Sequence, residues 1–183
     1  MADPHHVPDM DSFDRRTVAL YRLGLLGQAT LLCIAGVTIS APGIRIAWAL
    51  YAGFVALAAL NMHLYMKSFR WVISGAAWAG LVLQASAPAL PPTAAHWTWH
   101  AGLGCLFVAS SAWALKEQFC FRVPGMRLVP LMLAGSLLPI FMGQPHPFGP
   151  PIAISGALFA VLAAAKMRMP LHYDIGDKSR YQV

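Results

Sequence analysis

Long apolar stretches without a charged side chain dominate this chain. Four of them contain no Asp, Glu, Lys or Arg, and they cover residues 23–44, 46–66, 71–115 and 128–165. A helix needs about 20 mainly apolar residues to cross a hydrocarbon core of roughly 30 Å, so the first two stretches accommodate one span each. The last two are too long for one span, and Pro and Gly interrupt each near its middle. The pattern therefore predicts six helices, at residues 17–40, 44–66, 71–87, 97–119, 128–143 and 150–167.

The predicted fold class is all-α, a polytopic membrane protein built as a six-transmembrane-helix bundle. Hydrophobic residues make up 58% of the chain and charged residues 11%, a composition that a soluble domain of 183 residues could not easily bury. We expect a polar cytoplasmic arm at 1–16, the transmembrane domain at 17–169 and a cytoplasmic tail at 170–183. Small residues recur at every fourth position of the sixth predicted helix and indicate a face for close helix packing. The members of this stripe are Gly156, Ala160 and Ala164.

The basic residues lie almost entirely on one side of the predicted bundle. Of the 13 Lys and Arg residues, only Arg45 falls on the side opposite to the termini. Because positive residues in short loops favour the cytoplasm, we expect both termini there and the protein in the inner membrane of a bacterium. The net charge of +6 then belongs to helix ends, which orient the chain and contact anionic lipid. We therefore expect the basic residues to contact the lipid bilayer, and we do not expect the protein to bind nucleic acid.

A proline inside the fifth predicted helix is the candidate for a functional break. Pro139 has no N–H to donate, so it should kink the helix and free the carbonyl of Gly135. A helix broken in this way can line a ligand cavity, and a small transporter or channel is one alternative function. An ordinary kink without a cavity is the other interpretation. No carboxylate lies in the predicted hydrocarbon core, which weighs against transport coupled to protons or sodium.

Three histidines on the outer side are the candidates for a metal or haem site. His96 and His100 are four residues apart, so on a helix they share a face at a spacing that allows both imidazoles to bind one metal. His146, in the other outer loop, could supply a third ligand. A membrane redox or metal-binding protein is thus a second alternative. We favour interfacial histidines beside aromatic residues, and no cofactor, because two histidines without a carboxylate or cysteine are a weak metal signal.

Charged residues gather at the inner ends of the fourth and sixth predicted helices. Glu117 is the single Glu of the chain, and it could pair with Lys166, Arg168 or Arg22 across the bundle. The tail that follows combines a Pro, an aromatic residue, two Asp and a Gly within residues 170–178. We expect this tail to fold back against the end of the fourth helix and to present a partner-binding surface. The candidate partner-binding residues are Lys116, Glu117, His172, Asp174, Asp177 and Lys178.

Two segments of this inner face resemble a known family. They are Lys116-Glu117-Gln118-Phe119-Cys120-Phe121 and the tail from Lys166-Met167 through Met169-Pro170-Leu171-His172-Tyr173-Asp174-Ile175-Gly176-Asp177-Lys178. Together with Tyr21-Arg22 they make most of the chain similar to a family of uncharacterised bacterial integral membrane proteins, domain of unknown function 2301. The resemblance implies a multi-span membrane protein and transfers no catalytic residues.

The favoured function is that of a non-enzymatic accessory or assembly protein. Its expected partner is a larger membrane complex, which it meets through its helix faces and its basic cytoplasmic surface. The sequence contains neither a His-Glu-x-x-His zinc motif nor a Gly-x-Ser-x-Gly nucleophile turn. This absence is the reason for favouring a role without catalysis.

Overall fold

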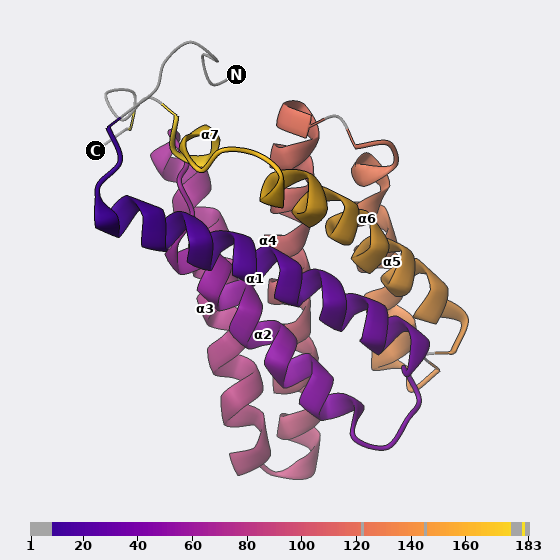
Figure 1. Cartoon of the computed structure of the whole chain (residues 1–183). Helices are drawn as coiled ribbons and strands as arrows, with labels where there is room; N and C mark the ends of the chain where they lie inside the picture. Colours follow the sequence, from indigo (N-terminus) through magenta and orange to yellow (C-terminus); the bar gives the residue numbers. More distant parts are fainter. Residues whose placement is uncertain (1–8, 122, 145, 177–180, 182–183) are drawn as a thin grey trace.

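The structure is a bundle of long helices. The computed structural model describes residues 9–121, 123–144, 146–176 and 181, and no strand occurs among them. The long helices α1 to α6 pack into one bundle, in which α1 runs obliquely across α2, α3 and α4 (Figure 1). Three short 3₁₀ turns and a one-turn helix, α7, lie between or after them. The predicted all-α class is confirmed.

The first helix begins earlier than the apolar pattern predicts. α1 covers Ser12–Val37, because Asp11 and Asp14 form a capping box at its start. The Asp14 N–H donates to Asp11 Oδ1 at 2.7 Å, and the Asp11 N–H donates to Asp14 Oδ2 at 3.2 Å. These bonds satisfy two amides that a helix start leaves unpaired. Part of the stretch predicted as a polar arm is therefore helical.

The second helix is shorter than predicted, and the third begins earlier. α2 covers Ile44–Leu60, and the side-chain amide of Asn61 donates to the Leu57 carbonyl at 2.8 Å just past its end. α3 then begins at Lys67 rather than at residue 71 and covers Lys67–Ser86. With 17 residues at about 1.5 Å each, α2 is about 25 Å long and does not by itself reach across a core of roughly 30 Å.

The third and fourth helices form a long hairpin. The turn η1 (Ala87–Ala89) leads from α3 to α4, which covers Pro92–Phe121 and starts well before the predicted residue 97. Proline suits a helix start because its φ is preset and its missing N–H would have no partner there. The turn of this hairpin lies far from the start of α1 and from α7 (Figure 1).

The fifth helix contains the predicted proline, but close to its end. The turn η2 (Met126–Leu128) leads to α5 (Val129–Phe141), and η3 (His146–Phe148) leads to α6 (Gly149–Met167). The carbonyl of Pro139 accepts a hydrogen bond from the Gln144 N–H at 2.9 Å. Pro139 therefore lies where the helix gives way to a turn, and a full half-helix does not follow it.

Helix α1 packs against α2 and α6, and its contact with α6 depends on small residues. A Cβ built on Gly156 of α6 would lie 2.5 Å from the Cys33 nitrogen of α1. A Cβ on Gly36 of α1 would lie 2.4 Å from the Ala153 nitrogen of α6. Real side chains do not tolerate such distances, so the two backbones approach as closely as only glycine permits. Gly156, from the predicted small-residue stripe, lies at this contact.

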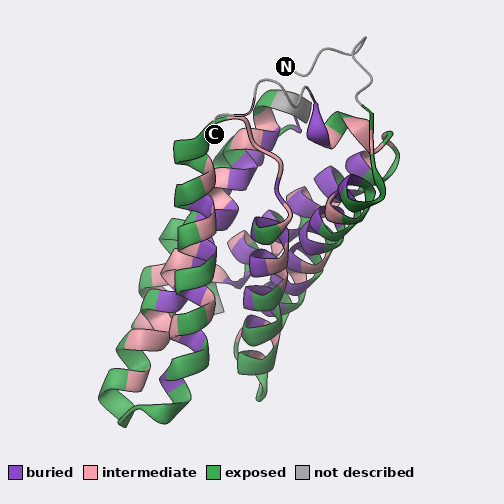
Figure 2. Ribbon diagram, turned by 90° about the vertical axis from the view of Figure 1, so that its left-hand side faces the viewer, coloured by how far each residue is buried: buried purple, intermediate pink, exposed green. Residues whose placement is uncertain are grey.

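The outer surface of the bundle is strongly apolar. Buried residues face the interior, and exposed residues lie along the outer faces of the helices (Figure 2). The exposed residues include large apolar side chains such as Val37, Trp71 and Leu131. Such a surface suits lipid, since contiguous apolar patches of this kind are rare on soluble monomers. Three helices among the described residues are long and apolar enough to cross a membrane, and two more are apolar but shorter. The three are Ser12–Val37, Lys67–Ala89 and Gly149–Met167, and the shorter ones are Ile44–Leu60 and Met126–Phe141.

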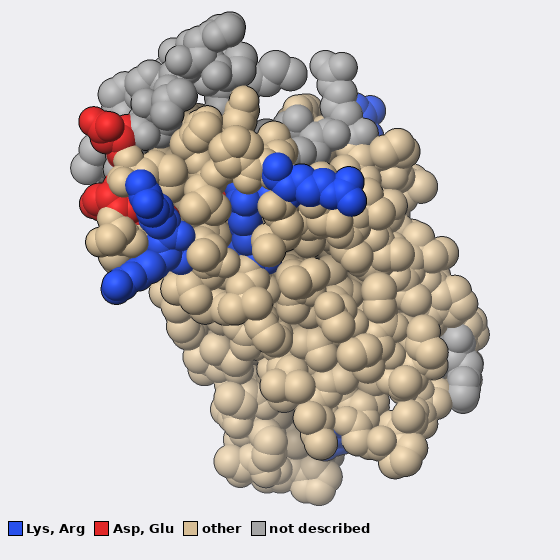
Figure 3. Space-filling view, viewed as in Figure 1, with Lys and Arg blue, Asp and Glu red and all other residues tan. Residues whose placement is uncertain are grey.

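The two ends of the bundle differ in charge. We call the end with the start of α1, the connection between α2 and α3 and the end of α6 the terminal end, and the end with η1 and η3 the distal end. Lys, Arg, Asp and Glu side chains gather near the chain ends, and little charge shows elsewhere on this face (Figure 3). Of the Lys and Arg residues that the structure describes, Arg45 alone lies at the distal end, in the first turn of α2.

Candidate functional site

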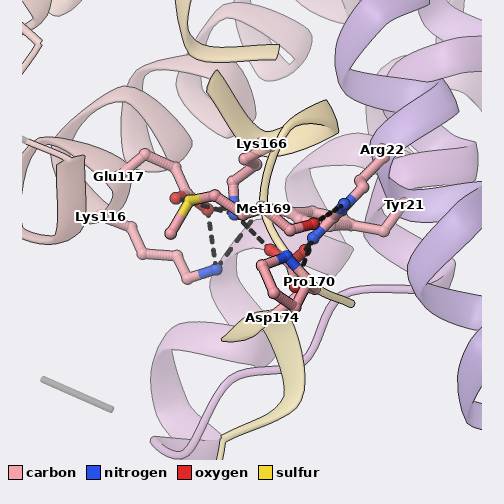
Figure 4. A network of polar contacts seen from close by, with 8 residues as sticks. All are labelled: Tyr21, Arg22, Lys116, Glu117, Lys166, Met169, Pro170 and Asp174. Carbon is pink, nitrogen blue, oxygen red and sulfur yellow. Dashed lines mark hydrogen bonds and ion pairs between the residues drawn. The ribbon is translucent and has the colours of Figure 1, made fainter. Parts of the chain in front are cut away.

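Polar side chains from four helices meet at the terminal end (Figure 4). They come from α1, from the last turns of α4 and α6, and from α7, which covers His172–Ile175. We call this group the terminal ionic network. Its members are Tyr21, Arg22, Lys116, Glu117, Lys166 and Asp174.

The carboxylate of Glu117 is fully enclosed by donors. Its Oε1 accepts from the Tyr21 hydroxyl at 2.6 Å and from Lys116 Nζ at 3.0 Å. Its Oε2 lies 3.1 Å from Lys166 Nζ, and only 1% of the side chain is exposed. A carboxylate out of contact with water needs such partners, so these contacts replace the hydration that Glu117 loses on folding.

The carboxylate of Asp174 fastens the tail to α1. Its Oδ2 accepts from Arg22 Nε at 2.6 Å, and its Oδ1 pairs with Lys166 Nζ. The guanidinium of Arg22 also donates to the carbonyls of Met169 and Pro170, at 2.8 and 3.0 Å. One arginine therefore holds both the connection after α6 and the short helix α7.

Lys166 joins the two halves of the network. Its ammonium contacts both Glu117 and Asp174, and the side chain is 3% exposed. The network holds three cations and two carboxylates, of which Lys116 is the most exposed cation, at 19%. When one member of such a buried group is removed, the remaining charges lose their compensation, which strongly destabilises a fold. The network therefore holds the tail in place.

The predicted pairings are partly present. Glu117 pairs with Lys166, one of its three predicted candidates. Arg22, another candidate, pairs with Asp174 of the tail instead, a pairing that the sequence does not predict. Arg168 is exposed, and no ion pair of this residue occurs among the described residues.

The other predicted partner-binding residues lie around this network. The His172 ring is half-buried and stacks on the Tyr173 ring with centroids 4.8 Å apart, and Tyr173 faces outward. Asp177 and Lys178 lie outside the described residues. The tail folds back against α1, whereas the sequence predicted the end of α4, which the tail reaches through Lys166.

A second contact of the tail involves Tyr181. Its hydroxyl donates to the Ile175 carbonyl at 2.7 Å, and its ring lies 5.1 Å from that of Tyr65 in the connection between α2 and α3. Burial raises the pKa of the Tyr181 phenol, and the nearby Tyr65 and Asp14 raise it further. The tail therefore contacts the α2–α3 connection as well as α1.

A smaller polar group lies in the middle of the bundle. The Tyr51 hydroxyl and Ser110 Oγ are 2.7 Å apart, and Ser110 Oγ donates to Gln28 Oε1 at 3.1 Å. Trp48 packs edge-on against the rings of Tyr51 and Phe107 beside this group. The mid-bundle amide and hydroxyls therefore satisfy one another within a packed core, apart from the unpaired Gln28 Nε2.

A pocket of about 480 Å³ lies at the distal end between α2, α3 and α4. Its wall consists mostly of Ala, Pro, Leu and Trp side chains. Four polar residues also line it, and Pro139 does not. Pockets of roughly 300 to 1,000 Å³ with few polar groups are typical of small-molecule sites. We call this cavity the distal pocket, and its polar residues are Arg45, Gln84, His96 and His100.

The two predicted outer histidines lie together in this pocket wall. Their ring centroids are 4.3 Å apart, and His100 Nδ1 lies 2.7 Å from the His96 carbonyl. Both rings also pack against Phe141 of α5. The side chain of His146 lies outside the described residues. No group of three or more metal-binding side chains occurs in the described part of the chain, and a metal or haem site stays a prediction.

Two arrangements were not anticipated from the sequence. One is the bond from Tyr21 to Glu117, for which the pair Tyr21-Arg22 in the family resemblance was the available signal. The other is the placement of Arg45 and Gln84 in the wall of one pocket, beside the histidines. An amide within an apolar helix and a lone outer cation are each signals of function, but their distance in sequence conceals that they line the same pocket.

Comparison with known proteins bears on the whole chain. Residues 49–183 match a family described as "Uncharacterized integral membrane protein (DUF2301)". The chain belongs to this family. A relative from Haemophilus influenzae, described as "Uncharacterized protein", is 36% identical over 185 residues, and the alignment covers 100% of both chains. No solved structure matches. The predicted family is confirmed, and the chain is an integral membrane protein.

Proposed function

We propose that this DUF2301 protein is a non-enzymatic accessory or assembly protein of a bacterial inner membrane, which binds an acidic protein partner at its cytoplasmic face. The observation that carries the proposal is the terminal ionic network. It fastens the tail, so that α7 belongs to a surface of fixed shape. A surface that is ordered before binding loses less conformational entropy when a partner docks.

The proposal includes six membrane crossings with both termini in the cytoplasm. It rests on the cations at the terminal end and on Arg45 as the single described cation at the distal end. The short helices α2 and α5 are part of the same bundle as the longer ones. Local thinning of the bilayer or the residues flanking these helices compensate for their length.

The network and the partner surface have different roles in this proposal. Glu117 and Asp174 are 1% and 4% exposed in their side chains, so they position the tail and offer almost no area to a partner. Lys116, His172 and the exposed Arg168 lie nearer the surface and make the contacts, together with Asp177 and Lys178. The positive charge of the exposed residues favours an acidic partner.

The topology is tested with reporters fused at three places. A reporter after Val183 and one in the 61–66 connection should report the cytoplasm, while one in η1 should report the opposite side. These outcomes are expected if α1 and α2 each cross the membrane, α3 crosses it to the outer side and α4 crosses it back to the cytoplasm. A cytoplasmic signal from η1 would rule out the six-span arrangement.

The partner surface is tested by photo-crosslinking in cells. A photoreactive amino acid replaces Tyr173, which is exposed beside the network, or Trp97, an exposed aromatic residue at the distal end, as a matched control. We expect a discrete protein adduct from position 173 and not from position 97, and we expect Arg168→Glu to abolish it. Adducts with lipid alone, or the same adducts from both positions, would contradict the proposal.

A further inference from the structure

Gln84 stands out among the polar groups of the bundle because both of its amide atoms lack a partner. The side chain lines the distal pocket and the residue is 6% exposed, yet neither its oxygen nor its nitrogen makes a hydrogen bond. Other orphaned side chains among the described residues have one unpaired buried atom each. An unpaired buried amide is unfavourable, and it becomes satisfied when a ligand supplies both a donor and an acceptor.

Arg45 brings an uncompensated positive charge to the same pocket. It is exposed in the first turn of α2, and no acidic residue that the structure describes lies at the distal end. The acidic residues that the structure describes, at positions 9, 11, 14, 117 and 174, all lie at the terminal end. A guanidinium without a protein carboxylate offers a planar fork that matches a carboxylate group of a ligand.

The rest of the pocket wall is apolar and favours a ligand whose middle part is apolar. Leu81, Trp99 and several alanines and prolines line the cavity, whose volume of about 480 Å³ suits a small molecule. His96 and His100 add ring nitrogens at the side of α4. A ligand that fills this space therefore needs an apolar middle with a polar group at each end.

We propose that the distal pocket binds a small hydroxy-substituted organic acid, with its carboxylate on Arg45 and its hydroxyl on the amide of Gln84. A hydroxyl both donates and accepts, so it satisfies the two atoms of Gln84 at once. An acyl chain of a lipid would leave Gln84 unpaired, and a neutral quinone would leave Gln84 Oε1 without a donor and Arg45 without an anion. This site is separate from the cytoplasmic partner surface and does not depend on it.

The test measures binding of matched probes to the full chain in phosphatidylcholine nanodiscs by saturation-transfer NMR titration, with empty discs as the blank. The acids are para-hydroxybenzoate and the longer para-hydroxyphenylpropionate, which place the hydroxyl at two distances from the carboxylate. Benzoate and phenylpropionate lack the hydroxyl, and the two para-hydroxy amides lack the charge. We expect at least one hydroxy acid to bind, and we expect its affinity to fall by about tenfold when either group is missing.

Two variants assign the contacts. Arg45→Gln should remove the advantage of the acid over its amide, whereas Arg168→Gln, the same change at the terminal end, should leave it intact. Gln84→Leu should remove the advantage of the hydroxyl, whereas Gln144→Leu, an exposed glutamine at the distal end, should not.

Four outcomes would overturn the proposal. The first is that neither hydroxy acid binds above the empty-disc blank. The second is that binding survives unchanged in Arg45→Gln and Gln84→Leu. The third is that the uncharged amides bind as well as the acids. The fourth is that replacing the lipid with phosphatidylglycerol displaces the acid completely, which would make the pocket a lipid site.

Discussion

The terminal ionic network buries paired charges, whereas the distal pocket buries the single amide of Gln84 and leaves Arg45 exposed, and both use residues of α4. In the network, each charged group lies within 3.1 Å of an opposite charge. In the pocket, the amide of Gln84 has no partner, and Arg45 has no acidic neighbour among the described residues. Groups that satisfy one another stabilise the fold, while unsatisfied groups around a cavity remain available to a ligand.

Removing a polar group should therefore have opposite effects on stability at the two ends of the bundle. A change in the network leaves a buried charge alone and destabilises the protein. A change in the pocket removes a group that the fold does not use.

Lys166→Met should have the largest effect. It leaves Glu117 and Asp174 without the cation that they share, and buried carboxylates that lose a partner typically destabilise a protein by about 3–5 kcal/mol. Thermal unfolding in one detergent, followed by circular dichroism, measures the loss. Arg168→Met, a change of the same kind at an exposed position two residues away, serves as the control and should unfold like the parent protein.

Asp174→Asn should have the next largest effect. The variant keeps the size of the side chain but loses the charge that faces Arg22 and Lys166, which should destabilise the fold by about 2–3 kcal/mol. Because Asp174 fastens α7, amide hydrogen exchange in 172–175 should rise more than in α3 or α5. Equal protection of α7 in both proteins would show that the network does not hold the tail.

Gln84→Leu should raise stability. The change replaces a buried amide without hydrogen bonds by an apolar side chain, which should stabilise the protein without ligand by about 1 kcal/mol. The same thermal unfolding experiment tests the sign. A clear loss of stability would mean that the amide is satisfied within the protein, and the contrast between the two ends would disappear.

Arg45→Gln should change stability least, by less than about 0.5 kcal/mol. The side chain is exposed and makes no ion pair in the part of the chain that the structure describes. A loss as large as that of Asp174→Asn would show that Arg45 serves the fold rather than a ligand.

Several features followed from the sequence because their causes are local. The absence of charge over residues 23–44 predicted α1 as a membrane helix, and the sixth helix, predicted at 150–167, begins one residue earlier as α6. Helix ends were less predictable. The capping box at Asp11 and Asp14 and the Asn61 cap decided where α1 begins and α2 ends, because side-chain bonds to the backbone there outweigh the apolar pattern.

The candidate site depended on contacts between distant parts of the chain. Sequence alone singled out Glu117 and the tail, since Glu117 is the single Glu of the chain and the tail motif is specific. It could not say that Asp174 would meet Arg22, 152 positions away, because many cations end their helices on the same side. It also did not bring Arg45 and Gln84 together.

The sequence by itself determined the membrane character of this protein, its helical class and its family, because apolar length and charge placement act within single segments. Only the tertiary structure decided which carboxylate meets which cation and where polar groups stay without a partner. Those outcomes depend on how α1 packs against α6 and how the hairpin of α3 and α4 packs against α2. Close backbone approach at Gly36 and Gly156 sets the first of these contacts, and such packing emerges from all the helices together rather than from one segment.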